Sequence, residues 1–321
     1  MVSIKSNTLT IVVPCYNEEA VIDEFIQEIL KTQETLPDIF IELILVNDGS
    51  KDGTKQKLKE LALSHRDRIT YISLSRNFGK EAALLAGLEN AQGEYIAVMD
   101  ADLQDPPSLL NEMLEGIIDE GYDVVGTRRT SREGEPPIRS WFANLYYKLN
   151  NKISDVYIEE GARDFRVMTY EVVQSIISLT ERNRFSKGLF AWVGYNVKYL
   201  EYPNIERESG ESSWSFRSLF NYAIEGLISF SEVPLTIATW VGFLSCLGAF
   251  GYGMFVTVRT LIYGAITPGW TSLAVMVVGM GGLQLLCLGI VGKYIGKIYI
   301  ESKQRPVYII QESIHNQHKH F

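Results

Sequence analysis

The sequence contains few cysteines and few histidines, and their positions argue against several kinds of site. The three cysteines, Cys15, Cys246 and Cys287, lie far apart in the chain, so neither a disulfide framework nor a zinc site is expected. All four histidines are peripheral, because His65 lies in a polar stretch and the other three crowd the C-terminus. A histidine general base, a Ser-His-Asp triad and a histidine metal site are therefore disfavoured.

Two common nucleotide-binding signatures and a basic face are also missing. No G-x-G-x-x-G follows the first predicted strand, and no G-x-x-x-x-G-K-[ST] occurs anywhere. Dinucleotide redox chemistry and P-loop hydrolysis therefore lack their usual signature. The formal net charge is -9, so nothing supplies the broad positive surface that nucleic acid requires, and nucleic acid is not expected as a partner.

Charge is absent from two long stretches near the C-terminus. Residues 233–258 and 260–292 contain no Asp, Glu, Lys or Arg. A helix of about 26 residues rises about 39 Å, which is enough to cross a hydrocarbon core of roughly 30 Å. We therefore predict a two-helix transmembrane hairpin over residues 233–298. The alternative, a helical hairpin buried in a soluble domain, is disfavoured by two uncharged runs of this length.

The flanking charges predict the orientation of this hairpin. Basic residues cluster just after the second uncharged run, whereas the turn between the runs has no charge; they are Lys293, Lys297, Lys303 and Arg305. By the positive-inside rule, both ends of the hairpin face the cytoplasm. The N-terminus has no apolar signal region. We expect a multi-pass protein of the cell (inner) membrane, with both termini cytoplasmic and residues 299–321 forming a cytoplasmic tail.

Short apolar runs alternate with helical patterns through the first part of the chain. The sequence predicts five strands, at Leu9–Val13, Ile41–Val46, Ile69–Leu74, Tyr95–Met99 and Asp123–Val125. Strands and helices that alternate at this spacing indicate βαβ units. The expected fold class is therefore α/β with a mostly parallel sheet.

The fourth predicted strand runs directly into polar side chains. Asp100, Asp102 and Gln104 follow it, at the strand end where open α/β sheets bind ligands. Two carboxylates one residue apart supply hard oxygen ligands that can share a divalent cation with a substrate diphosphate. The alternative is a turn in which Asp105 caps a helix whose first turn holds Pro106-Pro107. That alternative accounts for Asp105 but not for Asp100 and Asp102.

Polar and acidic stretches also follow the first two predicted strands. They are Pro14–Glu19 and Asn47–Gly53, and both should lie on the same edge as Asp100. Turn formation and helix capping explain the glycines of these stretches. It does not explain why carboxylates gather on one edge, where they repel one another unless a cation or a hydrogen-bonding ligand is present.

The polar stretches together resemble those of a known family. They are Pro14-x-Tyr16-Asn17-Glu18, Asn47-Asp48-Gly49-Ser50, Ser75-Arg76-Asn77-Phe78-Gly79-Lys80 and Asp100-Ala101-Asp102-Leu103-Gln104-Asp105. The sequence resembles the inverting GT-A glycosyltransferases of family 2. More narrowly, it resembles the polyprenyl-phosphate sugar transferases of the bactoprenol glucosyltransferase and dolichol-phosphate mannosyltransferase type. The resemblance continues through Asp164-Phe165-Arg166 and Arg207-x-x-Gly210-x-Ser212 to the paired apolar runs.

This resemblance implies a site with three parts, inside a GT-A domain over residues 1–210. The residues expected to bind the nucleotide sugar are Pro14, Tyr16, Glu18, Asp48, Lys80 and Asp100, with Asp48 at the position that holds the base. The expected ligands of Mg²⁺ or Mn²⁺ are Asp100, Asp102 and Gln104. Those expected to bind the lipid phosphate through guanidinium groups are Arg128, Arg139 and Arg207.

The resemblance places Asp164 at the point of attack, as the catalytic residue. From the residues alone, Asp164 could instead form a structural salt bridge with Arg163 or Arg166. A phosphate acceptor has a second pKa near 6, so it is mostly dianionic at neutral pH and already nucleophilic. Asp164 would then position the acceptor or shield its charge, and a role as general base stays open.

Three segments bear on where the acceptor binds. Apolar residues from Ile138 to Ile153 recur at helical spacing, which predicts an amphipathic helix that either covers the sheet or lies at the membrane interface. Residues 211–232 are expected to form a second amphipathic, interfacial helix. The basic stretch from Arg182 to Gly188 either meets anionic headgroups or the lipid phosphate, or is a solvated surface loop.

The implied activity is transfer of a hexose from a nucleotide sugar to a polyprenyl phosphate by single displacement with inversion. UDP-glucose and undecaprenyl phosphate are the donor and acceptor that the resemblance favours. A processive polysaccharide synthase of the same fold is disfavoured, since no Gln-x-x-Arg-Trp occurs and two spans leave little room for a polymer channel. A non-catalytic membrane adaptor is disfavoured by the intact Asp100, Asp102 and Asp164. Exposed aromatics near the spans permit homo-oligomers.

Overall fold

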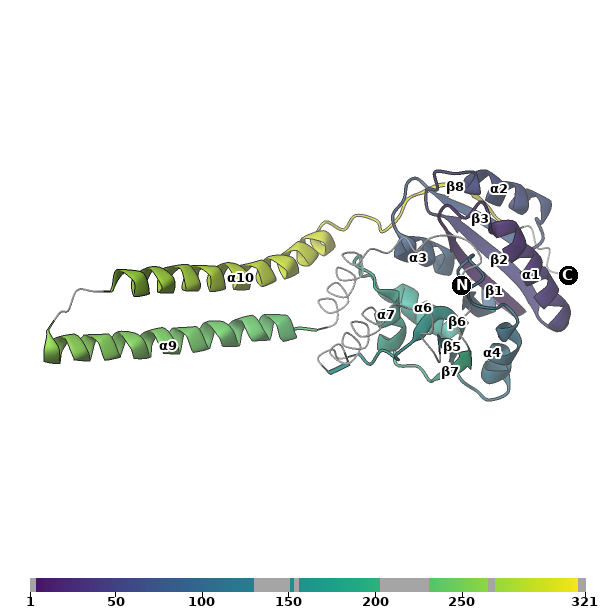
Figure 1. The fold of residues 1–321 in the computed structure, drawn as a ribbon. Helices are drawn as coiled ribbons and strands as arrows, with labels where there is room; N and C mark the ends of the chain where they lie inside the picture. Colours follow the sequence, from purple (N-terminus) through teal and green to yellow (C-terminus); the bar gives the residue numbers. More distant parts are fainter. Residues whose placement is uncertain (1–3, 130–150, 153–155, 203–230, 265–268, 317–321) are drawn as a thin grey trace.

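A computed structural model describes residues 4–129, 151–152, 156–202, 231–264 and 269–316 (Figure 1). The described residues form an α/β domain and two long helices that extend away from it. The strands of the domain make one eight-stranded sheet in the order β7-β5-β6-β4-β1-β2-β3-β8. Their bounds are β1 Lys5–Cys15, β2 Phe40–Asn47, β3 Ile69–Leu74, β4 Gly93–Val98, β5 Val124–Arg129, β6 Ala162–Thr169, β7 Val197–Tyr202 and β8 Ile310–Ile314.

Parallel pairing dominates the centre of the sheet, as the alternating pattern predicts. Strand β1 pairs in parallel with β2 and β4, and β2 pairs in parallel with β3. The C-terminal ends of these four strands therefore meet at one edge, where the loops with the predicted site residues begin. Strand β6 is antiparallel to both β4 and β5, and β7 is parallel to β5. The first four predicted strands are confirmed, and the fifth begins at Val124.

Helices cover both faces of the sheet because the central strands are apolar on both sides. In β1, Ile11 and Val13 face one apolar core and Val12 faces the other. Gly87 in α3 approaches β1 so closely that an added Cβ would lie 2.2 Å from Cγ1 of Val12. The first core packs against α1 Ile22–Thr35, α2 Thr54–Ser64 and α4 Leu109–Ile118, and the second against α3 Lys80–Asn90, α6 Tyr170–Ser178 and α7 Ser186–Trp192.

The two remaining helices, α9 Val233–Tyr263 and α10 Trp270–Ser302, run beside one another away from the domain (Figure 1). Both are long and apolar enough to cross a membrane, judged by length and composition. Their large apolar side chains are exposed along much of their length, as at Phe250 and Leu261. Such a surface is unfavourable in water and suits a lipid environment. The helices therefore indicate that the protein associates with a membrane.

Beyond α10 the chain returns to the α/β domain. Strand β8 pairs antiparallel with β3 at the edge of the sheet, with Tyr71 opposite Ile314. The Glu312 carboxylate accepts a hydrogen bond from the Tyr71 hydroxyl at 3.0 Å and pairs with Lys55 and Lys59 of α2. Part of the expected tail over residues 299–321 is thus a strand of the sheet.

Candidate active site

The loops that follow β1 and β2 are joined by hydrogen bonds at the edge of the sheet. Asn17 has a positive φ of 58°, and its side-chain oxygen accepts a hydrogen bond from the backbone N–H of Lys51 at 2.9 Å. The Glu19 carboxylate accepts a hydrogen bond from the N–H of Gly53 at 2.8 Å. These contacts hold two of the predicted nucleotide-binding loops in one arrangement.

Three of the predicted nucleotide-sugar residues lie at the end of β1 and in the loop that follows it. Pro14 occupies the end of the strand opposite Val46, and the Tyr16 side chain just beyond it is exposed. The backbone N–H of Glu18 donates a hydrogen bond to the Thr54 hydroxyl at the start of α2. The structure brings all three to the predicted edge, and their contact with a nucleotide stays a prediction.

Asp48, predicted to hold the base, is buried at the end of β2. Its carboxylate accepts hydrogen bonds from the backbone N–H groups of Phe78 at 2.7 Å and Gly79 at 3.0 Å. Burial raises the pKa of Asp48, although these N–H groups oppose the increase. Gly49 allows the close approach of the two loops, because an added Cβ would lie 2.4 Å from the backbone of Arg76. Asp48 therefore fixes the loop that leads to Lys80.

Lys80, the first residue of α3, lies between two predicted site carboxylates. Its Nζ is 2.7 Å from Oδ1 of Asp100 and 2.7 Å from Oδ2 of Asp164. The register of the sheet explains why these carboxylates meet. Val98 of β4 lies opposite Arg166 of β6 in an antiparallel pair, and continuing that register by two residues brings Asp100 opposite Asp164.

The two carboxylates titrate differently although they share one ammonium group. Burial raises the pKa of Asp100 above its usual range, and the Lys80 charge offsets that rise only in part while Asp164 adds to it. Burial acts in the same sense on Asp164, but the positive charges of Lys80 and Lys187 outweigh it and hold the pKa of Asp164 well below its usual range. Asp164 is therefore the carboxyl of the pair that holds its proton less tightly.

The loop after β4 is held by Arg163 of β6. Arg163 donates from Nη2 to Oε1 of Gln104 at 3.1 Å and from Nε to Oδ1 of Asp105 at 3.1 Å. Oδ1 of Asp102 accepts a hydrogen bond from the backbone N–H of Gln104 at 3.2 Å. Arg163 of β6 thus ties its strand to the loop that follows Asp100.

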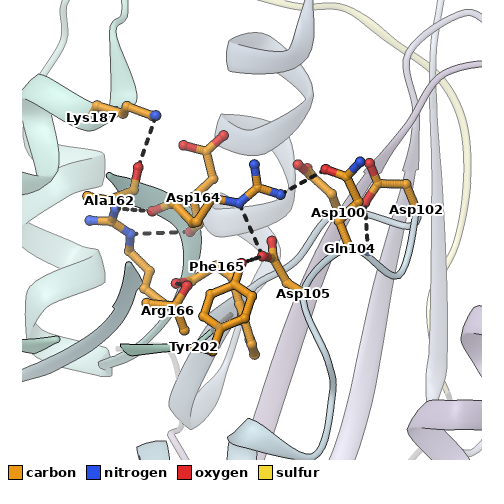
Figure 2. Close-up of polar contacts among 12 residues, drawn as sticks. Asp100, Asp102, Gln104, Asp105, Ala162, Asp164, Phe165, Arg166, Lys187 and Tyr202 are labelled. Atoms are coloured by element: carbon orange, nitrogen blue, oxygen red, sulfur yellow. Dashed lines mark hydrogen bonds and ion pairs between the residues drawn. The ribbon is translucent and has the colours of Figure 1, made fainter. Parts of the chain in front are cut away.

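The alternative in which Asp105 caps a helix does not match the structure. Helix α4 begins at Leu109, after Pro106-Pro107 rather than around them, and its N-cap is Ser108. Asp105 is instead buried beneath the loop, where its carboxylate accepts hydrogen bonds from Arg163 and from the Tyr202 hydroxyl of β7 (Figure 2). The Asp105 carboxylate thus makes this buried contact rather than capping α4.

The oxygen donors at this edge suit a hard divalent cation. Asp100, Asp102 and Gln104 supply two carboxylates and an amide oxygen, the ligand type that Mg²⁺ and Mn²⁺ prefer. In the described part of the chain, no group of three or more His, Cys, Asp or Glu side chains is arranged to hold a metal ion by itself. This set therefore fits a cation whose coordination is completed by substrate oxygens rather than a closed protein cage.

The structural salt bridge considered for Asp164 is not seen in the described residues. Its carboxylate pairs with Lys80, whereas Arg163 pairs with Asp105. Arg166 donates to the backbone carbonyl of Asp164 at 3.3 Å and lies over the Phe190 ring. The Asp164 carboxylate thus has its ion-pair partner at the start of α3.

The residues predicted to bind the lipid phosphate are only partly described. Arg128 of β5 makes ion pairs with Glu159, at 2.5 Å, and with Glu201. Two carboxylates therefore already surround its guanidinium group, and its role toward a phosphate stays a prediction. Arg139 and Arg207 lie outside the described residues, as do most of the two predicted amphipathic helices.

The basic stretch from Arg182 to Gly188 divides into two parts. Arg184 donates to the backbone carbonyls of Leu179 and Ile176, and Arg182 donates to the carbonyl of Arg305 beyond α10. Lys187 instead lies beside β6, where its Nζ donates to the carbonyl of Ala162 at 3.1 Å (Figure 2). The sequence shows that this stretch is basic, but it does not indicate which of its cations lies near Asp164.

A mostly parallel α/β sheet whose strand ends gather carboxylates at one edge is the architecture of the GT-A glycosyltransferases. The chain belongs to glycosyl transferase family 2, because residues 10–177, from β1 into α6, match the model of that family. It is a glycosyltransferase, and the predicted family and fold are confirmed.

Relatives match almost the whole chain, including both apolar helices. A putative glycosyltransferase of Bacillus subtilis, CsbB, is 44% identical over 309 residues, which cover 96% of this chain and 93% of that protein. The bactoprenol glucosyl transferase of Shigella phage SfV is 41% identical over 303 residues, covering 94% and 98%. A solved mannosyltransferase from Pyrobaculum calidifontis aligns with a TM-score of 0.44 and 17% identity over 89% of this chain and 86% of that one, a likeness too weak to bear on the site.

Proposed function

We propose that this protein transfers a hexose, glucose from UDP-glucose, to a polyprenyl phosphate, undecaprenyl phosphate, and releases the nucleoside diphosphate. The observation that carries the proposal is the 41% identity to a bactoprenol glucosyl transferase, which extends over 94% of the chain and so includes the apolar helices as well as the sheet. Membrane helices joined to a glycosyltransferase domain suit an acceptor that lies in a lipid bilayer.

The same proposal includes a divalent cation, Mg²⁺ or Mn²⁺. Asp100, Asp102 and Gln104 would hold it at the end of β4, together with oxygens of the donor diphosphate. When bound, such a cation stabilises the negative charge that develops on a leaving nucleoside diphosphate. Support comes from the hard oxygen donors of this loop, which are the ligand type that both ions prefer. Arg163 donates to the Gln104 side-chain oxygen, so that oxygen would be shared between the guanidinium group and the cation.

Asp164 and Lys80 would act at the reacting centre. A phosphate acceptor is already largely dianionic at neutral pH and needs little help from a base. The pKa of Asp164 is held well below its usual range by Lys80, which makes its carboxylate a weak proton acceptor. We therefore assign Asp164 to orienting the acceptor for attack with inversion, while Lys80 keeps Asp100 and Asp164 in place.

The proposed membrane topology is the one predicted from the apolar runs and their flanking charges. Helices α9 and α10 would both cross the cell (inner) membrane, with the catalytic edge and both termini in the cytoplasm. Support comes from the basic residues that follow the second apolar run and from β8, which returns the chain after α10 to the same sheet as the catalytic loops. We retain residues 1–210 as the GT-A domain, 211–232 as an interfacial helix and 233–298 as the hairpin, with β8 of residues 299–321 joining the domain.

The proposal is tested with purified protein in detergent, undecaprenyl phosphate, Mn²⁺ and radiolabelled UDP-glucose. Label should enter the organic phase, and a chelator should prevent this. If UDP-glucose fails, other nucleotide sugars are tried in the same assay. Failure with all of them would contradict the transferase proposal and favour a non-catalytic adaptor.

A further inference from the structure

Lys187 is held near Asp164 by a contact between helices α3 and α7. Glu81 of α3 accepts hydrogen bonds from the backbone N–H of Ser186 at 3.0 Å and from the Ser186 hydroxyl. Glu81 directly follows Lys80, and Ser186 directly precedes Lys187. This one contact therefore brings two lysines to the neighbourhood of Asp164, one from α3 and one from α7.

Lys187 differs from three neighbouring cations in having no carboxylate at ion-pair distance among the described residues, a feature it shares with Arg166, which donates to backbone carbonyls. Lys80 pairs with Asp100 and Asp164, Arg128 with Glu159 and Glu201, and Arg163 with Asp105. Lys187 is half-buried, and its ammonium group donates to the carbonyl of Ala162. Among the residues that the structure describes, no carboxylate lies within ion-pair distance of it. The charge of Asp164 acts on Lys187 without a direct ion pair, so the ammonium group keeps N–H donors that a second anion can accept.

The position of Lys187 separates it from the loop that would hold the donor diphosphate. Figure 2 shows Lys187 on one side of Asp164 and Asp102 with Gln104 on the other. The carbonyl that Lys187 contacts belongs to Ala162, two residues before Asp164 in the sequence. An anion bound by Lys187 would therefore lie on the far side of Asp164 from the donor diphosphate.

We propose that Lys187 binds the phosphate of the lipid acceptor and holds it beside Asp164. The inference rests on the proposed function and names a residue of its acceptor site. An ammonium group has three N–H donors, and the carbonyl of Ala162 takes one, which leaves two for phosphate oxygens. The positive charge also offsets the repulsion between a phosphate dianion and the ionised Asp164, so that the two groups can lie close together.

The test compares Lys187→Met, Lys187→Arg and the matched control Lys198→Met. Lys198 is also a half-buried lysine of the α/β domain, but its ammonium group pairs with Glu120 on α4's side of the sheet. In the full chain in detergent, KM is measured separately for undecaprenyl phosphate and for the nucleotide sugar, with melting temperature as a check on folding. Inhibition by inorganic phosphate is measured against the lipid in parallel.

Loss of a charge-assisted hydrogen bond to phosphate should raise the acceptor KM of Lys187→Met by about 10- to 100-fold, with the donor KM changed by less than about twofold. Lys187→Arg should restore most of the affinity, and Lys198→Met should match the wild type. Weaker competitive inhibition by inorganic phosphate in Lys187→Met would support a site for the phosphate itself.

The outcomes separate this inference from the proposed function. If the wild type makes no lipid product with any nucleotide sugar, the proposed function fails and the inference fails with it. If the wild type is active, an unchanged acceptor KM in Lys187→Met would overturn the inference alone. A rise in the donor KM instead would place Lys187 at the diphosphate and would also overturn it.

Discussion

Replacing Lys80 with methionine should strengthen metal binding in the absence of nucleotide. The ammonium group of Lys80 lies 2.7 Å from Asp100, a proposed metal ligand. Lys80 therefore competes with a cation for the same carboxylate. Methionine keeps much of the side-chain volume and removes the charge, so Asp100 and Asp164 are left without their shared partner.

The magnitude follows from how exposed this ion pair is. The side chains of Lys80 and Asp100 are 44% and 30% exposed. Fully exposed ion pairs contribute about 0.2–1 kcal/mol to stability, and buried hydrogen bonds to charged groups contribute about 1.5–3 kcal/mol. The Lys80–Asp100 pair lies between these two classes. We take about 1–2 kcal/mol for the competition. Because about 1.4 kcal/mol is a factor of ten, Mn²⁺ should bind about 5- to 30-fold more tightly.

The assay is a titration of nucleotide-free protein with Mn²⁺, followed by electron paramagnetic resonance of the free ion. Lys57→Met is the matched control. Lys57 of α2 also lies 2.7 Å from an aspartate, Asp23 of α1, but this pair is not part of the candidate site. The Mn²⁺ affinity of Lys57→Met should equal that of the wild type. An unchanged or weaker Mn²⁺ affinity in Lys80→Met would refute the competition between Lys80 and the metal at Asp100.

Three further predictions concern Asp102, Asp164 and Glu312. Asp102→Ala should abolish Mn²⁺-dependent binding of the nucleotide sugar in a calorimetric titration, and wild-type binding would remove Asp102 from the metal site. Asp164→Asn should lower turnover by at least about tenfold with donor affinity nearly unchanged, since orientation of a reactant contributes at least this much; full turnover would make Asp164 structural. Hydrogen bonds from Lys59 and Tyr71 lower the pKa of Glu312 to about 2. Glu312→Gln should therefore destabilise the protein by about 1 kcal/mol at neutral pH, and this difference should shrink as pH falls below about 4.5, because the unfolded carboxylate then protonates first. A difference in thermal unfolding that does not depend on pH would contradict this origin.

The sequence predicts the central strands because they are buried on both faces. Strands β1 to β4 are mostly apolar along their central residues, as a parallel sheet covered by helices requires. Strand β6 escapes the pattern because Arg163, Asp164 and Arg166 place charges within it. Strand β8 is short and polar, and its partner β3 lies far away in the sequence. Neither strand has a local signal that distinguishes it from a loop.

The sequence predicts which edge of the sheet carries the candidate site, but not which side chains form ion pairs there. Parallel strands bring their C-terminal ends together, so the gathering of Asp48 and Asp100 at one edge follows from the order of strands and helices. The contact between Lys80 and Asp164 spans 84 residues and depends on the antiparallel register of β4 and β6. The proximity of Lys187 depends in turn on the contact between Glu81 and Ser186. These are tertiary relations that spacing in the sequence does not encode.

The most direct test of the account is the structure of the reaction product. Lipid recovered from the reaction with UDP-glucose and undecaprenyl phosphate is analysed by mass spectrometry for its hexose content and by NMR for the configuration of the anomeric carbon. We expect one hexose on each lipid phosphate, with the anomeric configuration inverted relative to the donor. A polymer of hexoses, a retained configuration or an unmodified lipid would contradict this expectation.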